Sequence, residues 1–308
     1  MHDGWDRRST WTRKALRAFL ACVLLQAAMV CVLAAAQSAP ARHFLWKVTS
    51  PAGHEAYLLG SVHVLSKSFY PLSPVIDQAF AASKTLVEEV DLDEMNNPAT
   101  MMGLMGKAML PDGQTLDQVV SGETFAAVRA RADGHGVPML LLQRMKPWMV
   151  AVTLTAAEIS KAGFDSSLGI DKHFFDRAKA AGMPVRALET AAYQFDRLDG
   201  LAGTLQETSL KAMLADIDTQ AKNIETLAAA WRAGDTASLE GLLMEGFKEA
   251  PEIAERLLYE RNRNWVEPVE RCLTEDARCF IVVGAAHLVG PKSLVDLLRE
   301  RKHVLVQQ

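Results

Sequence analysis

The chain has 308 residues, of which 49% are hydrophobic and 23% are charged, a balance typical of a globular protein with a substantial core. Its formal net charge is −4 at pH 7. This acidic excess argues against a nucleic acid as the partner, because nucleic-acid binding needs a basic surface.

The first 36 residues have the pattern of a secretory signal peptide. Basic residues lie within positions 7–17, and the apolar stretch "AFLACVLLQAAMVCVLAAA" follows and ends in an A-x-A-like cleavage site. We therefore expect residues 1–36 to be removed on export and residues 37–308 to form one periplasmic or secreted domain. The apolar stretch is longer than usual, so the alternative is an uncleaved inner-membrane anchor with the domain facing the periplasm. Membrane contact is expected only in that case.

The remaining chain alternates strand-like and helical patterns. "HFLWKVT" and "EAYLLGSVH" predict a hairpin around "SPAGH", and a helix is expected after Pro74. "TLVEEVDL" predicts a strand, residues 99–181 are mostly helical, and "MPVRALET" predicts another strand. Three helical patterns, one long and ending at Gly234, fill residues 191–270 before strand "CFIVVG", a helix after Pro291 and strand "HVLVQQ". The order predicts an α/β fold: a mixed sheet carrying a large helical insertion.

Two cysteines, Cys272 and Cys279, follow the predicted signal peptide and are separated by "LTEDAR". An oxidising compartment favours a disulfide between them, linking a helix end to the next strand. The alternative is two free thiols, one of them buried in the strand. The six-residue spacing is a poor match to a zinc site.

A glycine-to-histidine pattern occurs twice at strand ends. "GSVH" ends at His63 after the run "YLLG", and "GAAH" ends at His287 after "CFIVVG". Ligands of open α/β sheets bind beyond the carboxyl ends of the strands, and glycine permits a sharp turn there. If the two strands are neighbours, the imidazoles converge in a way that suits metal binding or proton transfer. The alternative is a chance duplication of structural turns.

Charged side chains interrupt two otherwise apolar patterns. In "LVEEVDL", Glu89 lies on one face of the expected strand and Glu88 on the other. Buried carboxylates need a partner or a cation, unless the strand end is already emerging into solvent. Arg261 shares the apolar stripe of its helix with Leu257 and Trp265. It therefore needs a carboxylate or an anionic ligand, or else it snorkels along the edge of the stripe.

Taken together, these pieces resemble the TraB/PrgY/GumN family, which includes the animal TIKI proteins. The matching pieces occur in the family's order over about Phe44–Gln308 and include "FLWKVT", "YLLGSVHVL", "TLVEEVDLD", "GIDKHF", "VRALET", "ERNRNW" and "VGAAHLVGP". The resemblance implies a fold related to erythromycin-esterase-like and ChaN-like proteins. The family's hallmark residues fall on His63, His287, Glu89 and Arg261. For the TIKI relatives, the resemblance implies a metal-dependent peptidase activity.

The expected function is that of an exported hydrolase acting on a peptide or small-molecule substrate. A divalent ion (Mn, Co or Zn) would be held by His63, Glu89 and His287, and its bound water would attack an amide or ester. Glu189 could act as general base, and Arg261 could hold an oxyanion or a substrate carboxylate. Two alternatives stay open: a metal-independent, esterase-like hydrolase that uses the same residues as acid and base, and a protein that binds or scavenges a peptide signal without turnover. The chain has neither H-E-x-x-H nor G-x-S-x-G.

Overall fold

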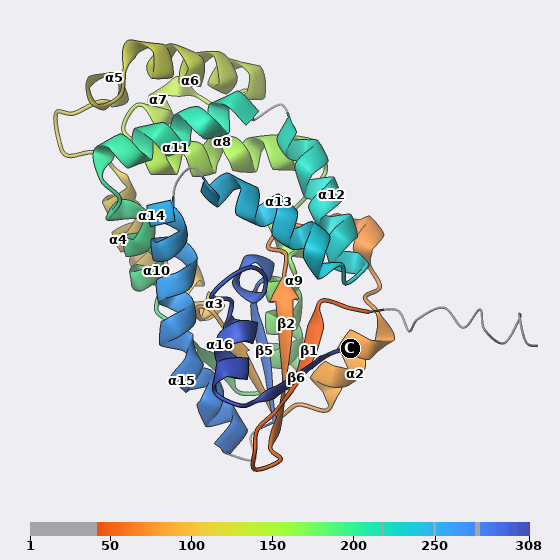
Figure 1. Ribbon diagram of the computed structural model, residues 1–308. Coiled ribbons are helices and arrows are strands. Elements are labelled where there is room, and N and C mark those ends of the chain that lie inside the picture. The colour runs from red at the N-terminus through yellow and green to blue at the C-terminus, as the bar shows by residue number, and fades with distance from the viewer. Residues whose placement is uncertain (1–41, 217–218, 249–250, 275–277) are drawn as a thin grey trace, which may run out of the picture. The chain divides into compact units, whose positions relative to one another are not determined.

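The computed structural model describes residues 42–216, 219–248, 251–274 and 278–308 (Figure 1). The predicted signal peptide, residues 1–36, lies outside these described residues. No helix within them combines the length and the apolar character needed to cross a lipid bilayer. The proposal of one domain over residues 37–308 stays a prediction.

The described residues form a mixed sheet of six strands in the order β4-β3-β5-β2-β1-β6. The strands are β1 (Leu45–Thr49), β2 (Glu55–Ser61), β3 (Thr85–Glu88), β4 (Val185–Ala187), β5 (Cys279–Gly284) and β6 (Val304–Gln307). β4, β3, β5 and β2 run parallel, β1 is antiparallel to β2, and β6 is antiparallel to β1. The predicted hairpin, the later strands and the α/β class are therefore confirmed.

Helices connect and cover these strands. They are α2 (Pro74–Ala81), α3 (Leu92–Asn96), α4 (Pro98–Ala108), α5 (Leu116–Val119), α6 (Gly122–His135), α7 (Met139–Leu142), α8 (Pro147–Lys161), α9 (Ile170–Ala180), α10 (Ala191–Asp199), α11 (Gly203–Asp216), α12 (Gln220–Arg232), α13 (Thr236–Lys248), α14 (Pro251–Ala254), α15 (Glu260–Thr274) and α16 (Leu294–Glu300). Shorter turns are η1 (Lys67–Phe69), η2 (Ser166–Leu168), the π-helical η4 (Glu255–Tyr259) and η5 (Ala285–Leu288). Local signals explain several boundaries: Ser73 caps α2 ahead of Pro74, and Gly136 ends α6 with a φ of 67°.

The two faces of the sheet carry different helices. Cys279 of β5 is bonded to Cys272 of α15. The next residue, Phe280, packs against Phe80 of α2 and Phe174 of α9, with ring centroids 5.4 Å and 4.8 Å away. Because successive side chains of a strand point to opposite faces, α15 covers one face while α2 and α9 cover the other (Figure 1).

The predicted helical insertion has an apolar core of its own. Fully buried side chains from α5, α6, α7, α8 and α11 meet there: Leu116, Val128, Leu142, Leu154 and Leu210. A buried hydrogen bond of 2.6 Å, from Trp231 Nε1 in α12 to the Gly60 carbonyl, fastens the later helices to β2. This bond anchors the end of β2, where the first histidine motif begins.

Two predicted elements differ from the structure. β3 stops at Glu88, since Asp91 caps α3 by accepting the Asp93 N–H at 2.9 Å and turns the chain away from the sheet. The long helix expected to end at Gly234 is described instead as α11 and α12. Thr219 Oγ1 donates to the Asp216 carbonyl at 2.7 Å, a side-chain contact that competes with continuing the helix. The described residues between 191 and 270 accordingly hold more helices than the three predicted.

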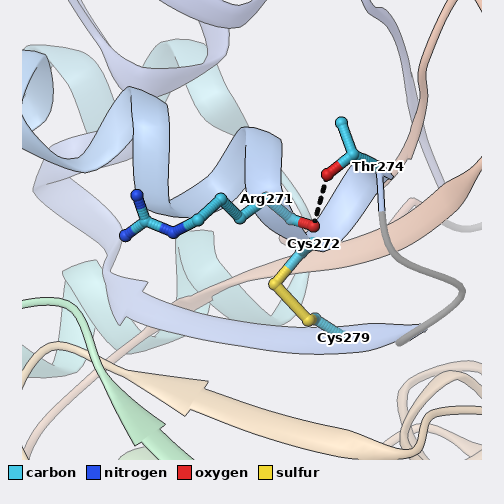
Figure 2. Close-up of a disulfide and its surroundings, with 4 residues drawn as sticks. All are labelled: Arg271, Cys272, Thr274 and Cys279. Carbon is cyan, nitrogen blue, oxygen red and sulfur yellow. Dashed lines mark hydrogen bonds between the residues drawn. A yellow bond between two sulfur atoms is a disulfide. The ribbon is translucent and has the colours of Figure 1, made fainter.

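The predicted disulfide between Cys272 and Cys279 is present, and it joins the end of α15 to the start of β5 (Figure 2). Both cysteines are buried, and their Cα atoms are 5.8 Å apart. Beside the bridge, Thr274 Oγ1 donates to the Arg271 carbonyl at 3.0 Å, at the last residue of α15 (Figure 2). The disulfide therefore ties the helix that carries Arg261 to a central strand.

Replacing Cys272 and Cys279 together with alanine should lower the free energy of unfolding by about 2–3 kcal/mol, because the bridge restricts the unfolded chain. Urea unfolding of the double variant against the wild type measures this loss. Wild-type protein kept in reductant is the control, since it loses the bridge while keeping the side chains. Coinciding curves for oxidised and reduced wild type would contradict the prediction.

Candidate functional site

The candidate site lies at the edge of the sheet where the four parallel strands end. The register pairs Ser61 with Gly284 and pairs Glu88 with both Val282 and Ala187, so β2, β5, β3 and β4 finish at a common edge. Each strand is followed within three residues by one of the site residues named from the sequence: His63, His287, Glu89 and Glu189. The two histidine motifs therefore stand on neighbouring strands.

Three of these side chains meet around Gly284. A Cβ atom on residue 284 would lie 3.2 Å from Glu89 Oε1, 3.4 Å from His63 Nε2 and 3.6 Å from His287 Cδ2. His63 Nε2 and His287 Cδ2 can be no farther apart than the sum of their distances from that Cβ position, so the two imidazoles lie close together. The space that the absent side chain leaves is bordered by a carboxylate and two imidazoles.

The expected role of glycine in sharp turns is wrong at both motifs. Neither Gly60 nor Gly284 has a positive φ; that of Gly284 is −52°. A Cβ on Gly60 would instead overlap the ring of Phe44, and a Cβ on Gly284 would enter the space described above. Glycine is therefore required at these positions by the close packing around them and not by an unusual backbone conformation.

Arg261 of α15 joins the acidic side chains to the second histidine. Nη2 donates to Glu89 Oε2 at 2.6 Å and to Glu189 Oε1 at 2.7 Å, and Nε donates to Glu189 Oε1 at 3.0 Å. Nη1 donates to the Leu257 carbonyl at 3.0 Å and to His287 Nε2 at 3.1 Å. With every N–H used and the residue only 6% exposed, the guanidinium is a buried clamp and does not snorkel.

The two carboxylates that Arg261 binds are held differently. Glu89 Oε1 accepts the Gly284 N–H at 2.7 Å, and Oε2 also accepts from Gln194 Nε2 at 3.0 Å. Burial would raise the pKa of Glu89, but nearby positive charge, chiefly that of His287 when protonated and of Arg261, holds the pKa at about 2. Burial raises the pKa of Glu189, against the opposing pull of Arg261. Both oxygens of Glu189 accept hydrogen bonds from Arg261, and Oε2 also accepts one from Trp265 Nε1. Glu189 is therefore held in place as a partner of Arg261.

His287 is buried and has a defined tautomer. Its Nδ1 donates to Asn262 Oδ1 at 2.6 Å, and the Asn262 amide is oriented by its own bond to the Lys292 carbonyl at 2.9 Å. The Trp265 ring lies 4.4 Å from the imidazole, centroid to centroid. Burial, with the positive charge of Arg261, lowers the pKa of His287 to about 3. The ring is therefore neutral at pH 7, and its Nε2 lone pair accepts the hydrogen bond from Arg261 Nη1.

His63 is held by an aspartate and faces solvent. Its Nδ1 donates to Asp171 Oδ2 at 2.8 Å, while Ser61 Oγ donates to Asp171 Oδ1 at 2.7 Å. The His63 side chain is 65% exposed. The negative charge of Asp171 raises the pKa of His63 to about 9. Gly169 makes this pairing possible, since a Cβ there would overlap the His63 backbone as the chain enters α9.

A cleft of about 510 Å³ opens beside these residues. It is lined by His63, Glu88, Glu89, Val90, Leu92, Met95, Ser166, Ser167, Asp171, Lys172 and Gln194. The strand register places Glu88 on the same face of the sheet as Phe280, the face that α9 covers. Burial, followed by the negative charges of Asp171 and Asp91, raises the pKa of Glu88 to about 9.

Sequence reasoning missed three residues that hold the site together: Asp171, Asn262 and Gln194. Asp171 falls within "GIDKHF" and Asn262 within "ERNRNW", so both were inside the motifs that carried the family resemblance. A polar residue next to Arg261 on the same helix was a usable signal for Asn262. Gln194, on α10, had no signal of this kind, because its contact with Glu89 spans 105 residues.

The donor set fits a divalent ion in kind. Two imidazoles and a carboxylate suit Mn, Co or Zn, and Glu89 Oε1, His63 Nε2 and the Cδ2 edge of the His287 ring border the space over Gly284. Asp171 and Asn262 each hold the Nδ1 of one imidazole, as the outer partners of metal-binding histidines do. In the described parts of the chain, no three His, Cys, Asp or Glu side chains already stand as a metal-binding group. Arg261 occupies Glu89 Oε2 and His287 Nε2, while Glu89 Oε1, the oxygen that borders the space, accepts the Gly284 N–H.

The fold and the site define an α/β protein with two histidine-bearing strand ends and a buried Glu–Arg–Glu cluster. The chain belongs to the TraB/PrgY/gumN family, whose model matches residues 44–306. It is 25% identical over 265 residues to the uncharacterized protein YbaP of Escherichia coli, which covers 83% of this chain and 94% of YbaP. It is 22% identical over 312 residues to Metalloprotease TIKI2 of Danio rerio, which covers 83% of this chain and 59% of TIKI2. No solved structure matches the chain significantly.

Replacing Arg261 with methionine should lower the free energy of unfolding by about 3–5 kcal/mol, because two buried carboxylates lose their counter-charge. Adding Glu189→Gln to the same protein should restore part of that loss. Arg263→Met is the matched control: this arginine of α15 is 47% exposed, and its loss should cost less than about 1 kcal/mol. Urea unfolding measures all three variants, and equal losses for Arg261 and Arg263 would contradict the prediction.

Replacing Gly284 with alanine should shift the ring NMR signals of both His63 and His287, because the new Cβ enters the space between them and Glu89. The fold should survive, since only one methyl group is added at a cost of about 1–3 kcal/mol. Gly103→Ala is the control, because a Cβ at that position in α4 meets nothing within 4 Å. Unchanged signals from both rings in the Gly284 variant would show that they do not converge there.

Proposed function

We propose that the protein is a hydrolase that cleaves an amide or ester bond at the cleft beside His63, Glu89 and His287. The observation that carries this proposal is the meeting of these three side chains around Gly284, at the edge where ligands of parallel sheets bind. A zebrafish relative is named a metalloprotease, which favours a peptide among the substrate classes. The transfer is by analogy, since one fold carries many activities.

In this proposal a divalent ion, Mn, Co or Zn, is held by His63, Glu89 and His287. When bound, the ion would polarise the scissile carbonyl and lower the pKa of a water molecule. The chain supplies the orientation: Asp171 directs His63 Nε2 toward the site, and Asn262 keeps the His287 Nε2 lone pair free of a proton.

Arg261 has a positioning role in this proposal. All of its N–H groups are already used, so it has no donor left for a substrate oxyanion or carboxylate unless an existing contact breaks. Its charge keeps Glu89 ionised and fixes the distance between β3, β4 and α15. Glu189 is the second anchor of this clamp, and it acts as a general base only if Arg261 releases it.

A metal-free hydrolase is the second candidate, and the pairing of His63 with Asp171 favours it. The pair faces the cleft, and the imidazole is mostly exposed. A histidine oriented by a carboxylate through Nδ1 can pass a proton through Nε2. In this version Arg261 provides the positive charge that the ion would otherwise bring to Glu89 and His287.

We also propose that the protein works in the periplasm or outside the cell. The disulfide and the signal-like pattern of residues 1–36 both support export. An inner-membrane anchor that leaves the domain in the periplasm is the alternative. Either compartment gives access to exported or extracellular peptides.

Metal analysis of the purified protein, joined to a peptide-library cleavage assay with and without chelator, tests the proposal. We expect a bound divalent ion, cleavage that stops with chelator and resumes with Mn, Co or Zn, and loss of both ion and cleavage in His63→Ala, Glu89→Gln and His287→Ala. His54→Ala is the control, because His54 lies in the hairpin turn before β2.

The other outcomes separate the alternatives. Cleavage that resists chelator but disappears in His63→Ala and Asp171→Asn would favour the metal-free hydrolase. Peptide binding without cleavage, unchanged by any added ion, would contradict the hydrolase and favour a scavenging protein.

A further inference from the structure

Glu88, the last residue of β3, is a buried carboxyl group that the proposed reaction does not use. It is 2% exposed, and neither of its carboxyl oxygens has a hydrogen-bond partner among the described residues. Buried carboxyl groups, ionised or neutral, are almost always hydrogen-bonded in folded proteins, since a buried polar group without a partner costs free energy. Its lack of a partner therefore indicates a group that binds from outside the chain.

The position of Glu88 shows what kind of group that is. The residue lines the cleft, and the apolar residues Val90, Leu92 and Met95 line it as well. Two further acidic residues, Glu89 and Asp171, line the same cleft. A cleft with apolar residues and a carboxyl group in a negative field suits a carbon chain that ends in a positive charge.

A small inorganic cation fits this place less well. A small inorganic cation needs several oxygen ligands, and both oxygens of Asp171 already accept hydrogen bonds, from Ser61 Oγ and from His63 Nδ1. The neighbouring cation, Lys172, also lines the cleft, but its ammonium group contacts both oxygens of Asp176 at 2.6 Å. An organic cation needs only one carboxylate and a surface for its methylene groups.

We propose that Glu88 is the anionic residue of a subsite that binds the cationic end of a substrate, an amine or guanidinium group carried on an aliphatic chain. A lysine or arginine side chain has this chemistry, and a peptide N-terminus offers the same charge directly on the backbone Cα. The claim that the bound group belongs to a substrate rests on the proposed hydrolase function. The binding of the cation does not, and it can be measured without turnover.

Titration with n-butylguanidinium and n-butylammonium, followed by NMR line broadening or calorimetry, tests the subsite directly, with n-butanol as the neutral comparison. Both cations should bind the wild type more tightly than n-butanol. Glu88→Gln should weaken cation binding by about tenfold or more and leave n-butanol unchanged, because a charge-assisted contact is lost. Asp93→Asn is the control, since Asp93 is an exposed carboxylate outside the cleft that pairs with Lys179.

Glu88→Gln should fold at least as stably as the wild type, because it removes a carboxyl group that is buried among like charges. Glu88→Met, which cannot accept a hydrogen bond from the cation as a carboxylate does, is the second variant and should show the same loss of binding. Equal binding of cations and n-butanol, or cation binding that survives in both folded variants, would overturn the proposal.

Peptides separate the two sources of the cation. A basic side chain as ligand predicts that an N-acetylated peptide containing lysine competes with n-butylguanidinium and that its norleucine counterpart does not. An N-terminus as ligand predicts that a free-amine norleucine peptide competes and that its acetylated form does not. Failure of every peptide to be cleaved would count against the hydrolase alone, whereas failure of every cation to bind would count against the subsite alone.

Discussion

The site depends on the hydrogen bonds that the Arg261 guanidinium donates to two glutamates and a histidine. The guanidinium binds Glu89 at the end of β3, Glu189 after β4 and His287 after β5, and so it links three of the four parallel strands at their common edge. Breaking such a buried cluster on one side leaves a charge without a partner, which is strongly destabilising. The planar fork of arginine is required because its five N–H groups bind Glu189 through two nitrogens and also reach Glu89, His287 and the Leu257 carbonyl, whereas a lysine ammonium has only three donors on one atom.

The fold brings Arg261 to this edge by several independent constraints. The π-helical turn η4 immediately precedes α15, and Arg261 binds the Leu257 carbonyl within it. At the other end of α15, the disulfide fixes the helix to β5. The neighbouring residue, Asn262, orients His287. One helix therefore supplies the counter-charge, the tautomer of one imidazole and a covalent link to the strand that ends at Gly284.

Much of this arrangement could be predicted from short-range patterns. The strand–glycine–histidine repeats placed His63 and His287 at strand ends, and helical spacing placed Arg261 on an apolar stripe, where it needed an anionic partner unless it snorkelled. The identity of the partners was not predictable, because Glu89 and Glu189 lie 172 and 72 residues away from Arg261 in the chain. The reason for the glycines was also hidden: Gly60 accommodates the Phe44 ring and Gly284 the site itself, contacts that depend on tertiary packing. The predicted strand "TLVEEVDL" extended past the end of β3 at Glu88. Alternation with a period of two does not reveal that Asp91 caps the following helix.

The central claim is that His63, Glu89 and His287 act together on one ion. A crystal structure of the protein grown with Mn²⁺, with anomalous differences measured for the metal, tests this most directly. We expect an anomalous peak within bonding distance of His63 Nε2, a Glu89 oxygen and His287 Nε2, with Arg261 turned away from at least one of these groups. A map without a peak at that position, in which Arg261 still donates to both Glu89 and His287, would contradict it.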